Sequence, residues 1–190
     1  MPIRIQNVRI AFPSLAVPQS LGDGEPAYQA KFIIEPNSPQ AKQIAEAIQA
    51  AAEEQWKDKA KQILKVINED KKSCYVTSEY RSKKTGEVYA GFEGKHYLSA
   101  RNAKNQPTIV SKFGKPITDP REIESVIYSG CYVHAMLDIW AQDNKWGRRI
   151  NCTLKGVMYA KDGDSFGGGG APASVGDFAD LATAEEDSLV

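Results

Sequence analysis

Two stretches decide the fold: CYVHAMLDI at residues 131–139 and RINCTLK at residues 149–155. Apolar and polar residues alternate in both stretches, which is the two-residue period of a half-buried β-strand. The pattern predicts a hairpin of residues 126–141 and 145–160, joined by a turn at 142–145. The expected buried face is Cys131, Val133, Ala135, Leu137 and Ile139 on one strand, with Ile150, Cys152 and Leu154 on the other. The residues expected to point away are Arg149, Asn151, Thr153 and Lys155.

Two more strands are expected at the N-terminal end. Residues 3–12 alternate in the same way, and Pro13 should end that strand because proline cannot donate to a ladder. A loop rich in glycine and proline follows at 20–26. In the next strand, at 28–35, one face carries Tyr28, Ala30, Phe32 and Ile34. We expect these two strands to pair antiparallel.

A further strand is expected over residues 88–100. Its apolar face consists of Val88, Ala90, Phe92, His96, Leu98 and Ala100. The opposite face is aromatic and cationic, with Tyr89, Lys95, Tyr97 and Arg101 in phase. Gly91 and Gly94 interrupt the run, which predicts a bulge or a sharp bend.

A long helix is predicted between the second and third of these strands, over residues 39–68. Ser38 is a favourable N-cap, and Pro39 suits the first helical position. Apolar residues then recur every three or four positions from Ala41 to Ile67, so one stripe should pack against a sheet. A straight helix of that length would be too long for a small barrel, and we expect a break near Asp58.

Charge is segregated along the chain. All 24 Lys and Arg, but only 17 of the 24 Asp and Glu, lie in residues 1–161, so this part carries +7 and residues 162–190 carry −7. We therefore expect one domain over residues 1–161 and a disordered, glycine-rich acidic tail over 162–190, because the tail has too few apolar residues to offset its ordering entropy. No apolar run approaches the roughly 18 residues of a membrane span, and no secretory signal is present, so a cytoplasmic protein is expected.

The candidate binding residues lie mostly between Lys71 and Lys115, where ten Lys or Arg face only three acids and six of the 17 aromatic residues occur. Single-stranded nucleic acid requires this combination, since cations follow the phosphates and rings stack on unpaired bases. The predicted DNA-binding residues are Tyr80, Arg81, Lys83, Lys84, Tyr89, Lys95, Tyr97, Arg101, Lys104, Lys112, Trp146, Arg148 and Arg149. We assign Phe92 and Phe113 to the core.

Composition alone leaves alternatives open. A solvated cationic surface with tyrosines capping a core has the same composition as a nucleic-acid interface. Trp146, Arg148 and Arg149 sit beside a hairpin turn and would be able to grip a strand, whereas we interpret Trp140 as a cap on the hairpin core. Whether Trp140 and Tyr132 face the core or a ligand is not decided by the sequence.

Other kinds of site are disfavoured. Cys131, His134 and Cys152 suggest zinc, but Cys131 and His134 are an odd number of residues apart and should face opposite sides of a strand. Three cysteines at wide spacing indicate reduced core residues rather than a disulfide framework. The glycine run at 167–170 lacks the Lys-Ser or Lys-Thr of a phosphate loop. We expect no metal, no cofactor and no catalysis.

The chain resembles the phage-encoded single-stranded DNA-binding proteins that have an oligonucleotide-binding (OB) barrel and an acidic C-terminal tail. The resemblance spans essentially the whole chain. Its most specific stretches are YSGCY at 128–132, IWAQDN at 139–144, GRRIN at 147–151, LKGV at 154–157, DGDSFGG at 162–168 and LSARNA at 98–103. It implies a mainly β fold, an antiparallel five-stranded barrel with an inserted helix, that protects single-stranded DNA in phage replication, recombination and repair.

The resemblance also implies that the tail contacts replication proteins such as DNA polymerase. The tail residues expected to bind such a partner are Asp177, Phe178, Asp180, Leu181, Glu185, Glu186 and Asp187. Because the tail hangs from a cationic body by a flexible linker, its local concentration at a cationic groove is high, and competition with DNA is expected. Related tails often end in acids plus a terminal aromatic, whereas this chain ends Ser188-Leu189-Val190.

Two rival functions remain open from the sequence. One is a protein-interaction or assembly module whose basic face docks an acidic partner. The other is RNA binding, since discrimination through the 2′-hydroxyl leaves no mark in composition. A homodimer is also compatible with the sequence.

Overall fold

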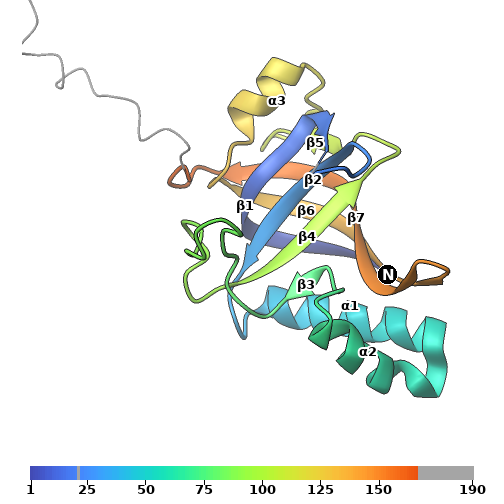
Figure 1. Ribbon diagram of the computed structural model, residues 1–190. Coiled ribbons are helices and arrows are strands. Elements are labelled where there is room, and N and C mark those ends of the chain that lie inside the picture. The colour runs from blue at the N-terminus through green and yellow to red at the C-terminus, as the bar shows by residue number, and fades with distance from the viewer. Residues whose placement is uncertain (21, 167–190) are drawn as a thin grey trace, which may run out of the picture.

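The computed structural model describes residues 1–20 and 22–166. Five strands close a barrel: β1 (Pro2–Gln19), β2 (Ala27–Ile34), β4 (His96–Asn102), β6 (Tyr132–Asn144) and β7 (Gly147–Lys161). Neighbours in the order β4-β2-β1-β6-β7 are antiparallel, and β4 returns to β7 in a parallel pairing (Figure 1). The short strands β3 (Tyr75–Val76) and β5 (Thr108–Val110) extend the sheet beside β4 and β7. The mainly β barrel with an inserted helix is therefore confirmed.

The β6–β7 hairpin has the predicted register. Leu137 lies opposite Leu154, and Ile139 opposite Cys152, and every residue expected on the inner face is buried. The turn is tighter than expected, because Asn144 pairs with Gly147 and leaves only Lys145 and Trp146 between the strands. The first strand also begins at Tyr132 rather than 126.

β1 continues past Pro13, so the prediction that this proline ends the strand is wrong. The register with β6 shifts between Ile5 and Val8, and that with β2 shifts between Ala11 and Ser14, which places Pro13 in a bulge where no ladder donor is needed. Phe12, next to this proline, has a positive φ of 51°, and its side chain is 45% exposed. The bulges thus turn an apolar ring outward from a core strand.

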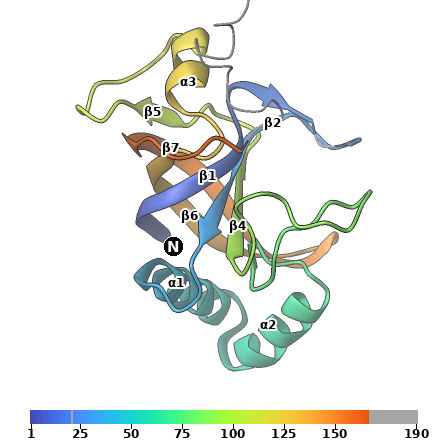
Figure 2. The ribbon, with the colours of Figure 1, turned by 90° about the vertical axis from the view of Figure 1, so that its left-hand side faces the viewer.

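The helical insertion begins and breaks where the sequence indicates. Ser38 Oγ accepts a hydrogen bond from Ala41 N at 3.1 Å, and α1 (Pro39–Trp56) follows. A 3₁₀ turn, η1 (Lys57–Lys59), separates it from α2 (Ala60–Glu69). The two helices lie together at one end of the barrel, and a third helix, α3 (Pro120–Val126), lies at the other end (Figure 2). Among the described residues, no helix is both long and apolar enough to cross a membrane.

Two elements differ from the sequence prediction. The expected strand at 88–100 begins only at His96, because Gly91 (φ 88°) and Gly94 (φ 68°) bend residues 88–95 into consecutive turns. A helix that was not expected, α3 (Pro120–Val126), starts at Asp119, whose side chain accepts a hydrogen bond from Arg121 N at 2.8 Å. Instead of extending the strand, the bent segment packs aromatic residues against Ala11 of β1 and Ile33 of β2.

Candidate nucleic-acid interface

A groove of about 970 Å³ crosses the barrel where β4 and β7 meet. These strands pair only through Arg101 and Thr153. Beyond that pair the segment around Cys74 fills the gap, since Cys74 N donates to Ile150 O and Ser99 N donates to Cys74 O, each at 2.8 Å. The strands therefore diverge without leaving backbone groups unpaired, and the groove forms over the divergence.

The groove is cationic throughout. Its lining includes six Lys or Arg and no Asp or Glu: Lys31, Lys71, Lys72, Arg101, Lys104 and Arg149. Lys72 forms an ion pair with Asp70 at 3.2 Å. Within the described part of the chain the other five make no ion pair with a carboxylate. Uncompensated cations along one concave surface produce a strong positive potential, which attracts an anionic polymer.

An aromatic cluster of Phe12, Tyr80, Tyr89, Phe92 and Tyr97 forms one wall. Tyr80 and Tyr89 stack with ring centroids 4.8 Å apart, and Phe12 meets Tyr89 edge-on at 5.2 Å. Phe92 is fully buried beneath them, while Phe12, Tyr80 and Tyr89 line the groove. The outer rings are thus held in place by inner ones, which lowers the entropy cost of presenting them to a ligand.

Trp140 lies on the groove surface and does not cap the hairpin core. Its ring is 41% exposed, and Nε1 donates to Thr153 Oγ1 at 3.0 Å across the β6–β7 pair. That hydrogen bond fixes the indole orientation and leaves its ring available to a ligand. Tyr132 lies elsewhere, with the Lys161 ammonium 4.7 Å from its ring centroid.

Lys31 is a groove cation that the sequence did not single out. Its Nζ donates to Ser99 Oγ at 2.8 Å and lies 4.5 Å from the ring centroid of Tyr80 and 5.2 Å from that of Tyr97. Burial, together with the nearby charge of Lys83, lowers the pKa of Lys31 to about 8. This lysine is therefore partly neutral only slightly above physiological pH.

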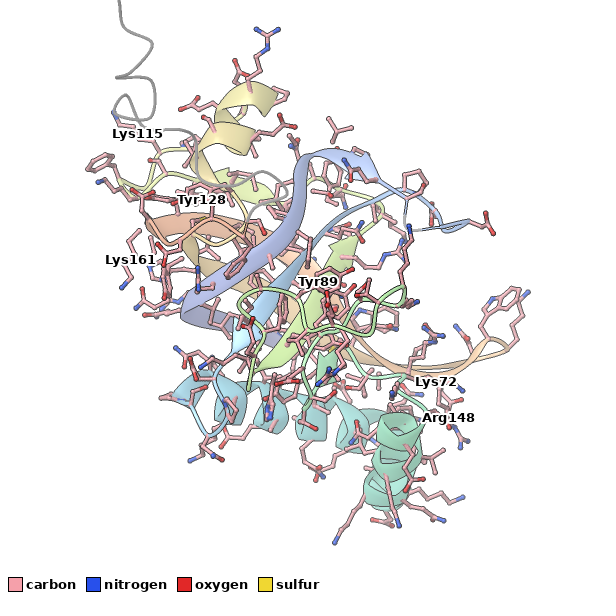
Figure 3. All side chains as sticks on the ribbon, turned by 60° about the vertical axis from the view of Figure 1, so that its left-hand side comes forward. Lys72, Tyr89, Lys115, Tyr128, Arg148 and Lys161 are labelled. Carbon is pink, nitrogen blue, oxygen red and sulfur yellow. The ribbon has the colours of Figure 1, made fainter. Side chains whose placement is uncertain are left out.

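Five of the predicted DNA-binding residues meet in the groove: Tyr80, Tyr89, Arg101, Lys104 and Arg149. They come from β4, β7 and the two loops that precede and follow β4. Figure 3 shows Tyr89 on the preceding loop, close to the centre of this face. The sequence alone does not place Phe12, Lys31 or Trp140 in the binding site. Phe12 lies at a bulge, and Lys31 and Trp140 lie within strands, and none of these positions has a sequence pattern that marks a binding residue.

The remaining predicted residues lie outside the groove. Tyr97 packs inside the aromatic cluster, and Lys95 forms an ion pair with Glu35 at 2.5 Å. Arg81 pairs with Glu79 at 2.6 Å, beside the turn that carries Lys83 and Lys84. The other three are Lys112, Trp146 and Arg148.

Lys112 lies on a separate surface. Its Nζ is 5.1 Å from the ring centroid of Phe113, which is 78% exposed, so the assignment of Phe113 to the core is wrong. Hydrogen bonds from Tyr159 and Tyr128, and to a smaller extent the charge of Lys112, lower the pKa of Asp162 at the root of the tail.

The hairpin tip is anchored to the helical insertion. Asp143 Oδ2 accepts hydrogen bonds from Trp56 Nε1 at 2.7 Å and from Arg148 Nε at 3.1 Å. These bonds, the one from Trp56 foremost, lower the pKa of Asp143. Trp146, at the turn itself, is 77% exposed. The tip therefore projects beyond the barrel in an orientation that the end of α1 sets.

The root of the tail, residues 162–166, packs on the barrel. Asp162 Oδ1 accepts hydrogen bonds from two tyrosine hydroxyls, and the one from Tyr159, at 2.7 Å, raises the pKa of Tyr159 to about 12. The Arg9 guanidinium lies 4.1 Å from the ring centroid of Phe166, and that ring occupies the space beside Gly91. Residues 162–166 thus end next to the aromatic cluster. The predicted partner-binding residues, 177–187, lie outside the described residues.

Cys131 and His134 face opposite sides of the sheet, as predicted. Cys131 is buried in the core, where burial raises its thiol pKa, whereas His134 Nδ1 accepts a hydrogen bond from Asn7 N at 3.2 Å. All three cysteines are free and buried.

A closed OB barrel with a cationic, aromatic groove is the architecture of oligonucleotide-binding proteins. A family model described as Enterobacter phage Enc34, ssDNA-binding protein, matches residues 1–190. The chain belongs to this family of phage single-stranded DNA-binding proteins.

Relatives agree with this assignment. A putative protein p50 of Acyrthosiphon pisum secondary endosymbiont phage 1 is 36% identical over 196 residues, covering 100% of this chain and 99% of that protein. The single-stranded DNA-binding protein of bacteriophage Enc34, solved in complex with ssDNA, superposes with a TM-score of 0.70 at 26% identity over 87% of this chain and 89% of its own. The bacteriophage T7 protein gp2.5 shares the fold, with a TM-score of 0.54 at 16% identity over 100% and 98% of the two chains.

Lys31 should titrate near pH 8, well below the exposed lysines. The unfolded chain keeps a lysine pKa near 10.5 and so binds more protons than the folded chain between about pH 8 and 10.5. The free energy of unfolding of the wild type, relative to Lys31→Met, should therefore rise with pH across this window. NMR titration of lysine side chains and urea unfolding at pH 7.5 and 9.5 test this expectation. If Lys31 titrates near the ordinary lysine pKa of 10.5, the assigned environment is wrong.

Proposed function

We propose that the protein binds single-stranded DNA in the groove between β4 and β7 and performs no catalysis. The observation that carries this proposal is a concave surface with six cations, no carboxylate and exposed rings. The cations contact phosphates, while Tyr89, Phe12 and Trp140 stack on bases and Tyr80 supports Tyr89 from behind. The predicted cations outside the groove, including Arg81, Lys83, Lys84, Lys95 and Lys112, add to the long-range field that attracts the strand.

Little sequence preference is expected. Stacking accepts every base, because all four present a π-face. Several of the groove amides are held by hydrogen bonds within the protein: Asn151 Nδ2 donates to Gln142 Oε1 at 3.0 Å, and Asn102 Nδ2 donates to Leu154 O at 3.1 Å. Few groups therefore remain to distinguish one base from another.

The biological role we propose is protection of single strands during phage replication, recombination and repair, in the cytoplasm of an infected bacterium. The phage origin of the relatives supports this context. We further propose that the acidic tail recruits replication proteins such as DNA polymerase and competes with DNA for the groove. The packed segment 162–166 supports competition between the tail and DNA, because the tail begins beside the aromatic cluster. Association into a homodimer is a separate hypothesis, which light scattering of the purified protein tests.

Binding of single-stranded DNA should weaken steeply with salt. If the six groove cations each neutralise one phosphate, the log-log slope of affinity against salt is about −4, at about −0.7 per phosphate. Arg149→Ala and Lys104→Ala should each make the slope shallower by about 0.7, whereas Lys65→Ala, on the exposed side of α2, should leave it unchanged. Titrations at several salt concentrations measure these slopes, and duplex DNA and RNA serve as comparison ligands. A slope near zero contradicts the proposed mode of binding.

Stacking separates DNA binding from the docking of an acidic protein partner. Single-stranded DNA should quench tryptophan fluorescence, and Trp140→Phe should remove part of that signal. Tyr89→Ala should cost about 1 to 3 kcal/mol of binding free energy, because one stacked base is lost. Polyglutamate, an anion without rings, is the control ligand. Equal quenching by polyglutamate and DNA would favour the protein-docking alternative.

Removing the tail after Phe166 should raise DNA affinity at low salt, and the gain should shrink at high salt because screening weakens the competing contact. Truncation at this point keeps the packed segment 162–166. The matched control keeps the full length and replaces the acids of 177–187 by their amides, so that only charge is lost. Equal affinity of all three proteins at low salt would rule out competition by the tail.

A further inference from the structure

A second cavity lies beside the groove, between α2 and the tip of the β6–β7 hairpin. Its volume is about 560 Å³, which is within the usual range of small-molecule sites. Ile63 and Val66 of α2 form one wall, and Gly147 and Arg148 of the hairpin form the other. We refer to it as the helix cleft.

The helix cleft is continuous with the groove. Lys72 borders both cavities. Figure 3 shows Lys72 and Arg148 side by side above α2, next to the hairpin. A DNA strand that leaves the groove past Lys72 therefore has the cleft next to it.

The rim of the cleft suits an anion. Lys59, Lys72 and Arg148 line it together with a single carboxylate, that of Asp70. Arg148 uses Nε for its bond to Asp143 at 3.1 Å, which leaves its two terminal nitrogens for another acceptor. Because Asp143 is itself fixed by Trp56, the guanidinium is held in position before a ligand arrives.

The floor of the cleft suits a flat apolar group. Val66 is 51% exposed although it is large and aliphatic, and Ile63 lies beside it. On the opposite wall Gly147 has a φ of 99° and carries no side chain, so the space in front of it is open. A nucleobase against Val66, with its phosphate near Lys72 and Arg148, matches both the apolar floor and the cationic rim.

We propose that the helix cleft is a nucleotide-binding subsite that takes one nucleotide of the DNA strand where it leaves the groove. The inference rests on the proposed function and extends it, because it makes the helical insertion part of the DNA-binding surface. An acidic peptide with an apolar anchor has similar chemistry, but the continuity with the groove at Lys72 favours the strand.

The first test measures the affinity of the full-length protein for oligothymidylates of increasing length. Wild-type affinity should stop rising once the groove and the cleft are both filled. Lys59→Glu and Val66→Asp should reach their plateau about one or two nucleotides earlier and bind shorter oligomers as the wild type does. Lys65→Glu is the matched control, since it makes the same charge change on α2 at a side chain that is 77% exposed and outside the cleft. It should keep the wild-type length dependence.

A second measurement does not depend on affinity. An environment-sensitive maleimide dye on V66C should respond to long oligomers and not to oligomers that fill only the groove; the three native cysteines are buried. An unchanged plateau length in both cleft variants, or a dye that responds to an acidic peptide and not to long DNA, overturns the subsite. In those outcomes short oligomers still bind, so the proposed function survives. Failure of every oligomer to bind would instead contradict the groove itself.

Discussion

The closure of the barrel between β4 and β7 is the constraint on which the binding surface depends. A single residue pair, Arg101 with Thr153, joins the two strands, and the segment around Cys74 satisfies the backbone groups on either side of the opening. If the strands remained paired over their full length, the groove would not exist. If the segment around Cys74 were absent, buried peptide groups would lack partners, which is costly in a dry interior. The opening is thus stable because its hydrogen bonds are supplied from a third place in the chain.

Around that opening, the cations attract an anionic ligand and the aromatic rings form a packed wall. The cations of the groove come from four separate stretches of chain, and only Lys72 among them forms an ion pair with a described carboxylate, so they act together on an anionic ligand. The rings behave differently, since the buried Phe92 and the half-buried Tyr97 pack behind Tyr80, Tyr89 and Phe12, which line the groove. The tail root uses the same cluster, because Phe166 packs against it and under Arg9. One aromatic cluster therefore links the groove wall to the point where the acidic segment begins.

Much of the fold follows from local pattern. The alternation in residues 131–139 and 149–155 correctly predicts the inner face of the hairpin, which is buried throughout, and Ser38-Pro39 starts α1 with the expected cap. Asp119-Pro120 carries the same type of signal and would have identified α3, but its apolar run is too short to stand out. Pro13 and residues 88–95 were misjudged for a different reason. A bulge and a series of glycine turns preserve the alternation in the sequence while changing where the side chains point.

By itself the sequence determined the strand and helix periods, the family resemblance and the separation of a basic body from an acidic tail. Each of these depends on residues that are close together in the sequence. Only the tertiary structure decided which cations and rings share a surface. Lys31, Trp140 and Phe12 line the groove. Lys95 instead forms an ion pair with Glu35, and Tyr97 is half-buried in the aromatic cluster. The physical reason is that a groove is formed by residues far apart in the chain. Its membership depends on barrel closure, bulges and long-range hydrogen bonds, none of which leaves a periodic trace in the sequence.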